Sequence, residues 1–358
     1  MEGKRKEPEA TTGGALVIKK QKTEEDAPTS KKQLISNIPT DAAKALMHIK
    51  RTSSLQAPIM LLSGHQAEVY SVRFNHTGSL LCSSSFDKCV YVWNTYGDCD
   101  NTMVLKGHAS AVLDSCFSHD STLIFSASAD KTLAVWDAET GTRIKKYQGH
   151  TSFVNSCSAT RRGAHLVVTT SDDSTVRLWD TRKRHAITSY DSQYAATSAC
   201  FSADSEQIFS AGIDNDIKVW SVREGGIENR FEGHTDTVTG IRLSPDGNYL
   251  LTNAMDDTVR IFDVKPYVKG NRCVKVFQGA QHNFEKNLLR CAWSPDGSRI
   301  SAGSSDRLVN IWDANTTKVL YKLPGHRGSV NDVDFHPTEP IIASASSDNN
   351  IYLGEIKL

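Results

Sequence analysis

The chain has 358 residues, and its 41 Lys and Arg side chains balance its 41 Asp and Glu side chains, so the formal net charge is zero. A neutral chain exerts no overall attraction on nucleic acids or anionic membranes. No apolar run reaches the roughly 18 residues of a transmembrane helix, and we expect no membrane association. The eight cysteines are scattered without a Cys-x-x-Cys pair, which predicts reduced thiols in an intracellular protein.

Residues 1–54 differ in composition from the rest of the chain. They carry eleven Lys and Arg residues, few apolar residues and no repeat. This composition predicts a basic, mostly disordered N-terminal tail, because such a segment has too little apolar surface to form a core. Lys4-Arg5-Lys6 and Lys19-Lys20-Gln21-Lys22 suit a nuclear-import signal or contacts with RNA phosphates. We expect any RNA contact to be indirect or minor and to involve this tail.

From residue 55 onward the chain repeats a unit of about 40–45 residues. Seven times an Asp stands six residues before a Trp or before the residue in the Trp position. These Asp residues lie 43, 43, 41, 42, 50 and 42 residues apart. A Gly-His pair precedes the Asp by 22 or 23 residues in five of the repeats, and His282 stands 24 residues before Asp306 without a Gly.

With Gly-His and Trp-Asp landmarks at this period, residues 55–358 resemble the WD40 repeat family. The resemblance implies an all-β fold, a seven-bladed WD40 β-propeller in which each repeat forms one four-stranded blade. Residues 59–62 stand where a fourth strand is expected, whereas the chain ends in a third strand at 351–356. We therefore expect residues 59–62 to complete the last blade and close the ring.

The landmark residues have a structural role in this family. The Asp and a Ser or Thr hydroxyl both bind the imidazole, and the hydroxyl also binds the indole, so that a buried network forms in each blade. Because this set repeats around a ring and offers no single exposed nucleophile, we expect no catalytic residue, metal ion or cofactor. The network is predicted to comprise His65, Asp87, Trp93, His108, Asp130, Trp136, His150, Asp173, Trp179, Asp214, Trp220, His234, Asp256, His282, Asp306, Trp312, His326 and Asp348.

Four repeats depart from this pattern. The fourth has Tyr190-Asp191 in place of Gly-His, and the fifth has Phe262 in place of Trp. The sixth has Ala302 in the hydroxyl position, and the seventh has Gly354-Glu355 in place of Trp-Asp. These changes predict that blades 4 to 7 are tied less rigidly than blades 1 to 3.

Residues just before the turn Asp and just after the Gly-His are predicted to surround the central channel on one face. Several of them are apolar, which favours a protein-contact surface. Insertions at 265–272 and 281–287 lengthen two loops, where binding residues are common, although neutral length variation explains them equally well. The candidate contact residues are Phe86, Phe153, Ile213, Met255, Phe284, Lys286 and Arg327.

Several stretches resemble one branch of the family, the WD40 proteins of the U5 small nuclear ribonucleoprotein in the spliceosome. The resemblance implies a non-catalytic scaffold in pre-mRNA splicing, located in the nucleus. It also implies a monomer bound to spliceosomal proteins, especially the large U5 subunits. The stretches are residues 53–65, 96–101, 149–157, 212–220, 282–291 and 352–356.

Two alternatives remain open. Trp179-Asp180-Thr181-Arg182 has the Trp-Asp-x-Arg form with which substrate receptors of cullin-type ubiquitin ligases bind their adaptor, and residues 220–223 are similar. A histone-tail reader would instead need acids at the channel mouth, where Glu68, Asp172 and Asp236 are candidates.

Overall fold

The computed structural model describes residues 51–268, 270–283 and 285–356. These residues belong to one compact unit, Arg51–Leu358. The tail predicted at residues 1–50 lies outside the described residues. Throughout the described ranges no helix is long and apolar enough to cross a bilayer. All eight cysteines are free thiols.

The unit consists of strands, and each blade contains four of them. The first four blades contain β2 (Val69–Phe74), β3 (Leu80–Ser85), β4 (Cys89–Asn94), β5 (Asn101–Lys106); β6 (Val112–Phe117), β7 (Leu123–Ser128), β8 (Thr132–Asp137), β9 (Arg143–Gln148); β10 (Val154–Ala159), β11 (Leu166–Ser171), β12 (Thr175–Asp180), β13 (Thr188–Asp191); and β14 (Ala196–Phe201), β15 (Gln207–Gly212), β16 (Ile217–Ser221), β17 (Ile227–Phe231). The last three contain β18 (Val238–Leu243), β19 (Tyr249–Ala254), β20 (Thr258–Asp263), β21 (Cys273–Gln278); β22 (Cys291–Trp293), β23 (Arg299–Ala302), β24 (Val309–Asp313), β25 (Val319–Leu323); and β26 (Val330–Phe335), β27 (Ile341–Ser346), β28 (Asn350–Glu355), β1 (Ile59–Ser63).

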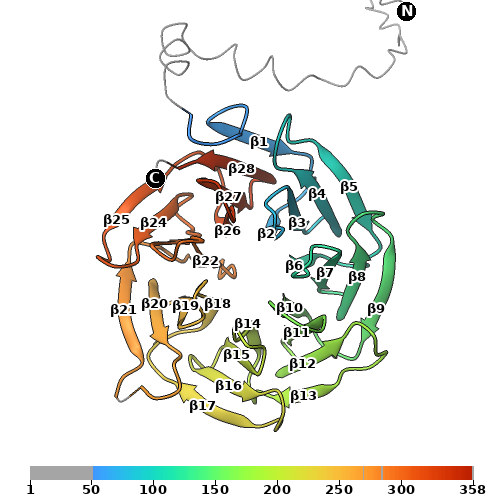
Figure 1. Cartoon of the computed structure of the whole chain (residues 1–358), viewed down its shortest axis with the longest axis vertical. Coiled ribbons are helices and arrows are strands. Elements are labelled where there is room, and N and C mark those ends of the chain that lie inside the picture. The colour runs from blue at the N-terminus through green and yellow to red at the C-terminus, as the bar shows by residue number, and fades with distance from the viewer. Residues whose placement is uncertain (1–50, 269, 284, 357–358) are drawn as a thin grey trace, which may run out of the picture. The chain divides into compact units, whose positions relative to one another are not determined.

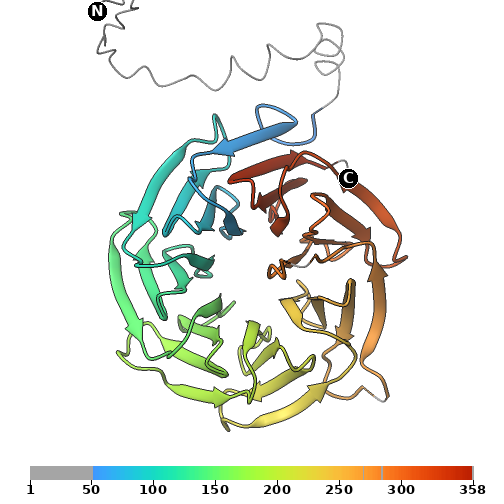
Figure 2. The ribbon, with the colours of Figure 1, turned by 180° about the vertical axis from the view of Figure 1, so that it is seen from behind.

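The strands form seven antiparallel four-stranded sheets arranged in a ring, with the first strand of each sheet innermost (Figure 1). The ring is a seven-bladed β-propeller, as the repeat predicts. In blade 7 the order is β1-β28-β27-β26, and Leu62 of β1 pairs with Ile351 of β28. Segments from the two ends of the described chain thus share one sheet, which is also visible from behind (Figure 2).

The hydrophobic core lies between neighbouring blades. Val90 and Val92 of blade 1 pack with Ile124 and Trp136 of blade 2 in one buried cluster, and each other blade pair has its own cluster. Apolar side chains on both faces of a strand are therefore expected, since each sheet is covered on both sides. The closing interface between blades 7 and 1 is built in the same way.

A tight turn between the second and third strands positions the landmark Asp of every blade. The residue after that Asp has a positive φ in all seven turns, at 69° for Lys88 and 67° for Lys131. No glycine stands at any of these positions, so each turn holds an unfavourable backbone conformation. The Asp offsets this cost, because its Oδ1 accepts the N–H two residues later, as in Asp130 to Thr132 at 3.2 Å.

Residues 51–54 lie on the N-terminal side of the boundary expected from the sequence, yet they contact blade 7. The Arg51 guanidinium donates to Oε2 of Glu355 over 2.8 Å, and Thr52 donates from Oγ1 to Oε1 over 2.6 Å. The Ser54 N–H donates to Glu339 over 2.7 Å. These bonds hold the segment before β1 against the closing sheet.

Candidate protein-interaction site

In blades 1, 2 and 3 the turn Asp, the His, a hydroxyl and the Trp form one buried set of hydrogen bonds. In blade 2, Nδ1 of His108 lies 3.1 Å from Oδ2 of Asp130. Its Nε2 lies 2.7 Å from Oγ of Ser126, which also accepts the indole N–H of Trp136 over 2.8 Å. Every polar atom of the set has a partner if Nδ1 carries the imidazole proton and the hydroxyl donates to Nε2. Equivalent contacts join His65, Asp87, Ser83 and Trp93 in blade 1, and His150, Asp173, Thr169 and Trp179 in blade 3.

The turn carboxylates of blades 2 and 7 are held in the ionised form. Burial by itself raises the pKa of Asp130, but hydrogen bonds from His108, Thr132 and the Ala109 N–H outweigh it and keep the pKa far below its usual range. The same balance lowers the pKa of Asp348 to about 2. These groups therefore act as permanent acceptors that fix the turn to the blade.

The glycine of the Gly-His pair makes room for the indole. A Cβ atom at Gly149 would lie 3.1 Å from Cη2 of Trp179, and one at Gly64 would lie 3.1 Å from Cη2 of Trp93. A side chain at either position would therefore push the Trp away from the hydroxyl that it binds. In blades 1 and 3 the Gly and the Trp thus share a close contact that leaves no room for a side chain at the Gly.

Blades 5 and 7 keep the His and Asp but not the indole. His234 lies 3.0 Å from Asp256, and Phe262 packs where the Trp would be, without a donor. In blade 7, His326 lies 3.1 Å from Asp348, and Gly354 stands in the Trp position.

The loss of Gly-His from the fourth repeat suggested a network that lacks one member. In blade 4, however, another residue takes the place of the His. Lys218 is buried, and its Nζ forms an ion pair with Asp214 and donates to Oγ of Ser192 over 3.0 Å. The Trp220 indole still donates to Ser210 over 2.7 Å. An ammonium group from the third strand thus takes over the pairing of the turn Asp, which no signal in the spacing indicated.

In blade 6 the prediction that His282 pairs with Asp306 is wrong. Strand β21 is followed by Gly279-Ala280, so that the buried Ala280 occupies the His position. His282 lies within the insertion, and its Nε2 is 3.5 Å from Oδ1 of Asn253 in blade 5. Trp312 donates to the carbonyl of Gln278 over 3.1 Å, because Ala302 offers no hydroxyl.

A second buried network lies on the inner strands and was missed by the sequence analysis. Arg73 of blade 1 pairs with Asp332 of blade 7 over 2.8 Å. Arg290 of blade 6 forms an ion pair with Asp114 of blade 2 and donates to the carbonyl of Asn155 in blade 3 over 3.1 Å. The Arg290 contacts join blades across the axis of the ring, whereas Arg73 and Asp332 join the neighbouring blades 1 and 7. The sequence feature that could have predicted this network is the presence of charged residues in first strands that are otherwise mostly apolar.

The described candidate contact residues lie on the turn-Asp face of the ring. Phe86, Ile213 and Met255 follow the second strands of their blades, and Phe153 and Arg327 precede first strands. The side chains of Phe86, Phe153 and Ile213 are 57, 49 and 54% exposed, whereas Met255 is half-buried.

Two further candidates belong to the insertion before blade 6. Lys286 is exposed, as is Arg327 on the neighbouring blade. Phe284 lies outside the described residues.

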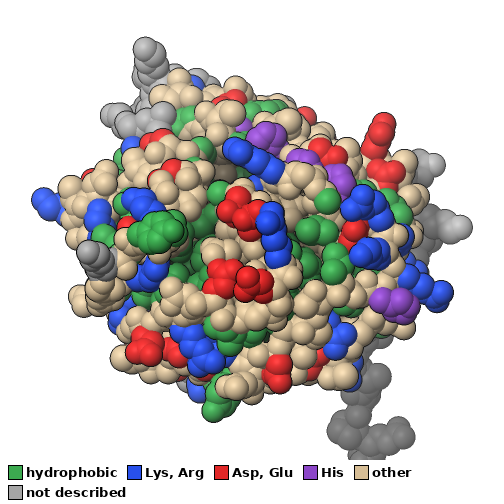
Figure 3. All heavy atoms as spheres, turned by 60° about the horizontal axis from the view of Figure 1, so that its bottom comes forward, with side chains coloured by type: hydrophobic (Ala, Val, Ile, Leu, Met, Phe, Trp, Pro, Cys, Tyr) green, Lys and Arg blue, Asp and Glu red, His purple; other side chains and the backbone are tan. Residues whose placement is uncertain are grey.

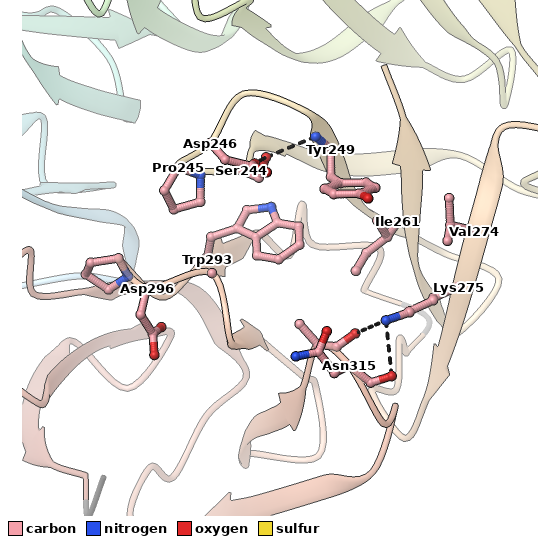
Figure 4. A pocket seen from close by; sticks show the side chains of 13 residues that line it. Ser244, Pro245, Asp246, Tyr249, Ile261, Val274, Lys275, Trp293, Asp296 and Asn315 are labelled. Carbon is pink, nitrogen blue, oxygen red and sulfur yellow. Dashed lines mark hydrogen bonds between the residues drawn. The ribbon is translucent and has the colours of Figure 1, made fainter. Parts of the chain in front are cut away.

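A hollow of about 470 Å³ lies between blades 5 and 6 (Figure 4). Tyr249 and Trp293 flank it, together with Asp246 and Asp296 from the first turn of each blade. Lys275 donates to the carbonyl of Ala314 over 2.7 Å. The lining holds no His or Cys beside a carboxylate, so the hollow offers binding surface and no acid–base pair.

Among the described residues, His119, Asp120 and His165 are close enough together to be considered as metal ligands. The two imidazole rings stack at 4.9 Å with an interplanar angle of 27°. Because the lone pair of each ring nitrogen lies in the ring plane, stacked rings do not direct their nitrogens toward a common ion. This geometry is that of a stacked pair on the surface.

The repeats match the family model described as "WD domain, G-beta repeat" at residues 56–94, 99–137, 141–180, 185–221, 225–263, 271–313 and 317–353. The chain belongs to the WD40 family of β-propeller proteins. It is 58% identical over 307 residues to the U5 small nuclear ribonucleoprotein 40 kDa protein of Homo sapiens, with 86% of each chain covered. It is 44% identical to the protein of the same name in Dictyostelium discoideum, over 87% of this chain and 88% of the relative. It is 40% identical to pre-mRNA-splicing factor cwf17 of Schizosaccharomyces pombe, over 99% of both chains.

Proposed function

We propose that this chain is a protein-interaction scaffold of the U5 small nuclear ribonucleoprotein and acts in pre-mRNA splicing in the nucleus. The observation that carries the proposal is the similarity to U5 40 kDa proteins along the whole propeller, with 58% identity over 86% of each chain. A rigid ring with exposed loops on both faces suits several partners at once. The partners we propose are the large protein subunits of the particle.

The proposed scaffold is non-catalytic. Its Ser-His-Asp sets have hydroxyls that cannot meet a substrate, since Ser83 and Ser126 are fully buried. Each hydroxyl is also occupied by an indole N–H. A nucleophile needs access to the reacting carbon, which these groups lack.

The proposed contact surface is the turn-Asp face that carries Phe86, Phe153 and Ile213. Their backbone N–H or carbonyl groups are bonded within the blades, as in Phe86 to Glu68 at 2.9 Å, while the side chains face solvent. Fixed apolar side chains lose little entropy when a partner covers them.

The geometry favours neither alternative function. Arg182 donates twice to Asp180 of its own blade, over 3.1 Å in both cases, so part of the group that a ubiquitin-ligase adaptor would bind is already engaged. At the channel mouth, Asp172 already accepts the Asn155 side-chain amide over 2.6 Å, which occupies one of the oxygens that a histone cation would need.

The test is purification of the tagged full chain from nuclear extract, with mass spectrometry of proteins and a blot for small nuclear RNAs. We expect U5 proteins and U5 RNA with the wild type and a loss with Phe86→Ala/Phe153→Ala/Ile213→Ala. The matched control is Ile144→Ala/Val274→Ala/Val319→Ala, which removes similar exposed apolar groups from outer strands. Recovery of a cullin adaptor without U5 proteins would contradict the proposal.

A further inference from the structure

Two adjacent loops at one end of blade 3 carry a dense group of basic side chains. They are the β10–β11 loop (160–165) and the β12–β13 loop (181–187), which lie on the face opposite the turn Asp residues. The Thr181 N–H donates to the carbonyl of His165 over 3.2 Å, so the loops are in contact. Figure 3 shows Lys, Arg and His side chains gathered toward the right of the view. The basic residues of the two loops are Arg161, Arg162, His165, Arg182, Lys183, Arg184 and His185.

Most of this positive charge is not compensated. Arg182 pairs with Asp180, and His165 lies 3.5 Å from Asp120. Arg161 donates only to neutral carbonyl groups, those of Leu243 and Ser244 in blade 5, over 2.7 and 2.9 Å.

Three further cations have exposed side chains. Lys183 is near enough to Asp180 for their charges to interact, but that carboxylate already accepts two hydrogen bonds from Arg182. Arg162, Lys183 and Arg184 are exposed and form no hydrogen bond or ion pair through their side chains with any residue of the described ranges. Together with Arg161 they place four permanent cations on two loops that contact each other.

The loops themselves are fixed in place. Thr160 donates through Oγ1 to the carbonyl of Ala164 over 2.7 Å, and the Lys183 N–H donates to the carbonyl of Asp180 over 3.0 Å. The Arg161 bonds attach the first loop to blade 5. The cations are thus held on a rigid support, which lowers the entropic cost of binding a partner.

The side chains of this surface select the kind of anion. Ile187, at 40%, is the one large apolar side chain of the two loops that is strongly exposed, and the loops contain no Phe, Tyr or Trp. Single-stranded RNA is bound by stacking on aromatic rings, and protein partners are anchored by apolar or aromatic groups. Double-stranded RNA is bound largely through its phosphates and shape, for which spaced Lys and Arg side chains suffice.

We propose that the blade 3 basic surface, residues 161, 162, 183 and 184, binds the phosphate backbone of double-stranded RNA without reading its sequence. The proposal stands on the charges of the surface and does not rest on the proposed function. It adds an RNA contact on the propeller to the one expected from the N-terminal tail.

The test measures binding of the full chain to an RNA duplex of about 20 base pairs, by fluorescence anisotropy between about 50 and 200 mM salt. The variant is Arg162→Gln/Lys183→Gln/Arg184→Gln. The matched control, Lys106→Gln/Lys318→Gln/Lys322→Gln, removes the same charge from exposed lysines of other blades. The tail is present in every protein, so the difference between the two triple variants isolates the blade 3 surface.

We expect the blade 3 variant to lose about tenfold or more in affinity near 100 mM salt, and its salt dependence to become shallower by roughly one unit per residue removed. The control should change by less than about twofold. Equal losses in both variants would overturn the proposal. It would also be overturned if an acidic peptide of equal charge bound the wild type more tightly than the duplex and lost that binding in the blade 3 variant.

Discussion

Blades 2 and 6 show two ways of building the same sheet. In blade 2 the turn Asp130 is joined to Trp136 through His108 and Ser126. In blade 6, Ala280 and Ala302 replace both the His and the hydroxyl residue. Losing one partner of a buried hydrogen bond leaves the other unsatisfied, whereas losing both together is nearly neutral. In blade 6 the His and the hydroxyl that would bind each other are therefore absent together, and neither leaves an unsatisfied partner.

Blade 4 shows a third arrangement, in which the His is lost but the Asp is not. Asp214 stays largely buried, and its charge is balanced by Lys218 from the third strand. The comparison indicates that a buried turn Asp requires a donor, and that the donor need not be an imidazole. Substitutions in blades 2, 4 and 6 test whether a buried turn Asp requires such a donor.

The largest effect is expected for Lys218→Met. The change leaves Asp214 as an unpaired, largely buried carboxylate and should lower the free energy of unfolding by about 3–5 kcal/mol. The control is Lys146→Met, since Lys146 also contacts a turn Asp, but that Asp keeps its His. It should cost less than about 1 kcal/mol. Similar losses in urea unfolding of the two variants would contradict this account of blade 4.

Ser126→Ala in blade 2 should lower the free energy of unfolding by about 2–3 kcal/mol. It removes the atom that binds both His108 and Trp136 and leaves two buried polar groups without a partner. The reverse change in blade 6, Ala302→Ser, should give no stabilisation, because Ala280 offers no imidazole to meet the new hydroxyl. A higher melting temperature for Ala302→Ser would contradict this expectation, because it would show that a hydroxyl at residue 302 still finds a hydrogen-bond partner in blade 6.

The inner and outer carboxylates should respond to pH in opposite directions. Burial raises the pKa of Asp334 to about 6, so between pH 6 and 4 the folded chain binds a proton that the unfolded chain does not. Stability should therefore rise as the pH falls through this window, by about 1–2 kcal/mol. The pKa of Asp348 is lowered to about 2, and its contribution is lost as the pH falls from about 4 toward 2.

Thermal unfolding between pH 7 and 3 checks this prediction. Asp334→Asn keeps an acceptor for the Phe74 N–H, which donates over 2.9 Å, but cannot titrate. The rise between pH 6 and 4 should disappear in that variant. If the variant keeps the rise, another group is responsible for it.

The smallest expected effect is an increase in stability. Phe262→Trp in blade 5 would place an indole donor near Thr252, which His234 already contacts over 2.7 Å. Gly233 is still present to make room for the larger ring. We expect a stabilisation of up to about 1 kcal/mol, the usual net value of a hydrogen bond, measured by chemical unfolding. A loss of stability would mean that the side chains around Phe262 pack too closely to admit the larger indole.

The sequence alone was sufficient to predict the parts of the fold that repeat from blade to blade. The period places seven Asp turns, and a constant spacing brings His65 to Asp87 and His326 to Asp348. A fourth strand was expected at residues 59–62, and β1 covers Ile59–Ser63.

Features that occur in only one blade could not be predicted from the spacing of the repeats. The insertion before blade 6 moved His282 out of register, because spacing cannot distinguish Ala280 as the residue in the His position. Lys218 reads as an ordinary strand residue until Asp214 is seen beside it. The Arg290 contacts across the axis join residues that are far apart in sequence. The contact surface depends on exposure, which the pattern of residue types does not determine.

The most direct test of the account is amide hydrogen exchange of the turns in blades 2 and 6. The Thr132 N–H and the Leu308 N–H each donate to the Oδ1 of their own turn Asp, over 3.2 and 3.1 Å, so the two amides hold equivalent positions in their turns, with Thr132 buried and Leu308 half-buried. In blade 2 that Asp is tied to the blade by His108, whereas in blade 6 the His position is occupied by Ala280. We predict that Leu308 exchanges about tenfold faster than Thr132 or more, since a difference of about 1.4 kcal/mol in local opening has this effect. Equal protection of the two turns, or slower exchange in blade 6, would contradict the claim that the buried network ties the turn to its blade.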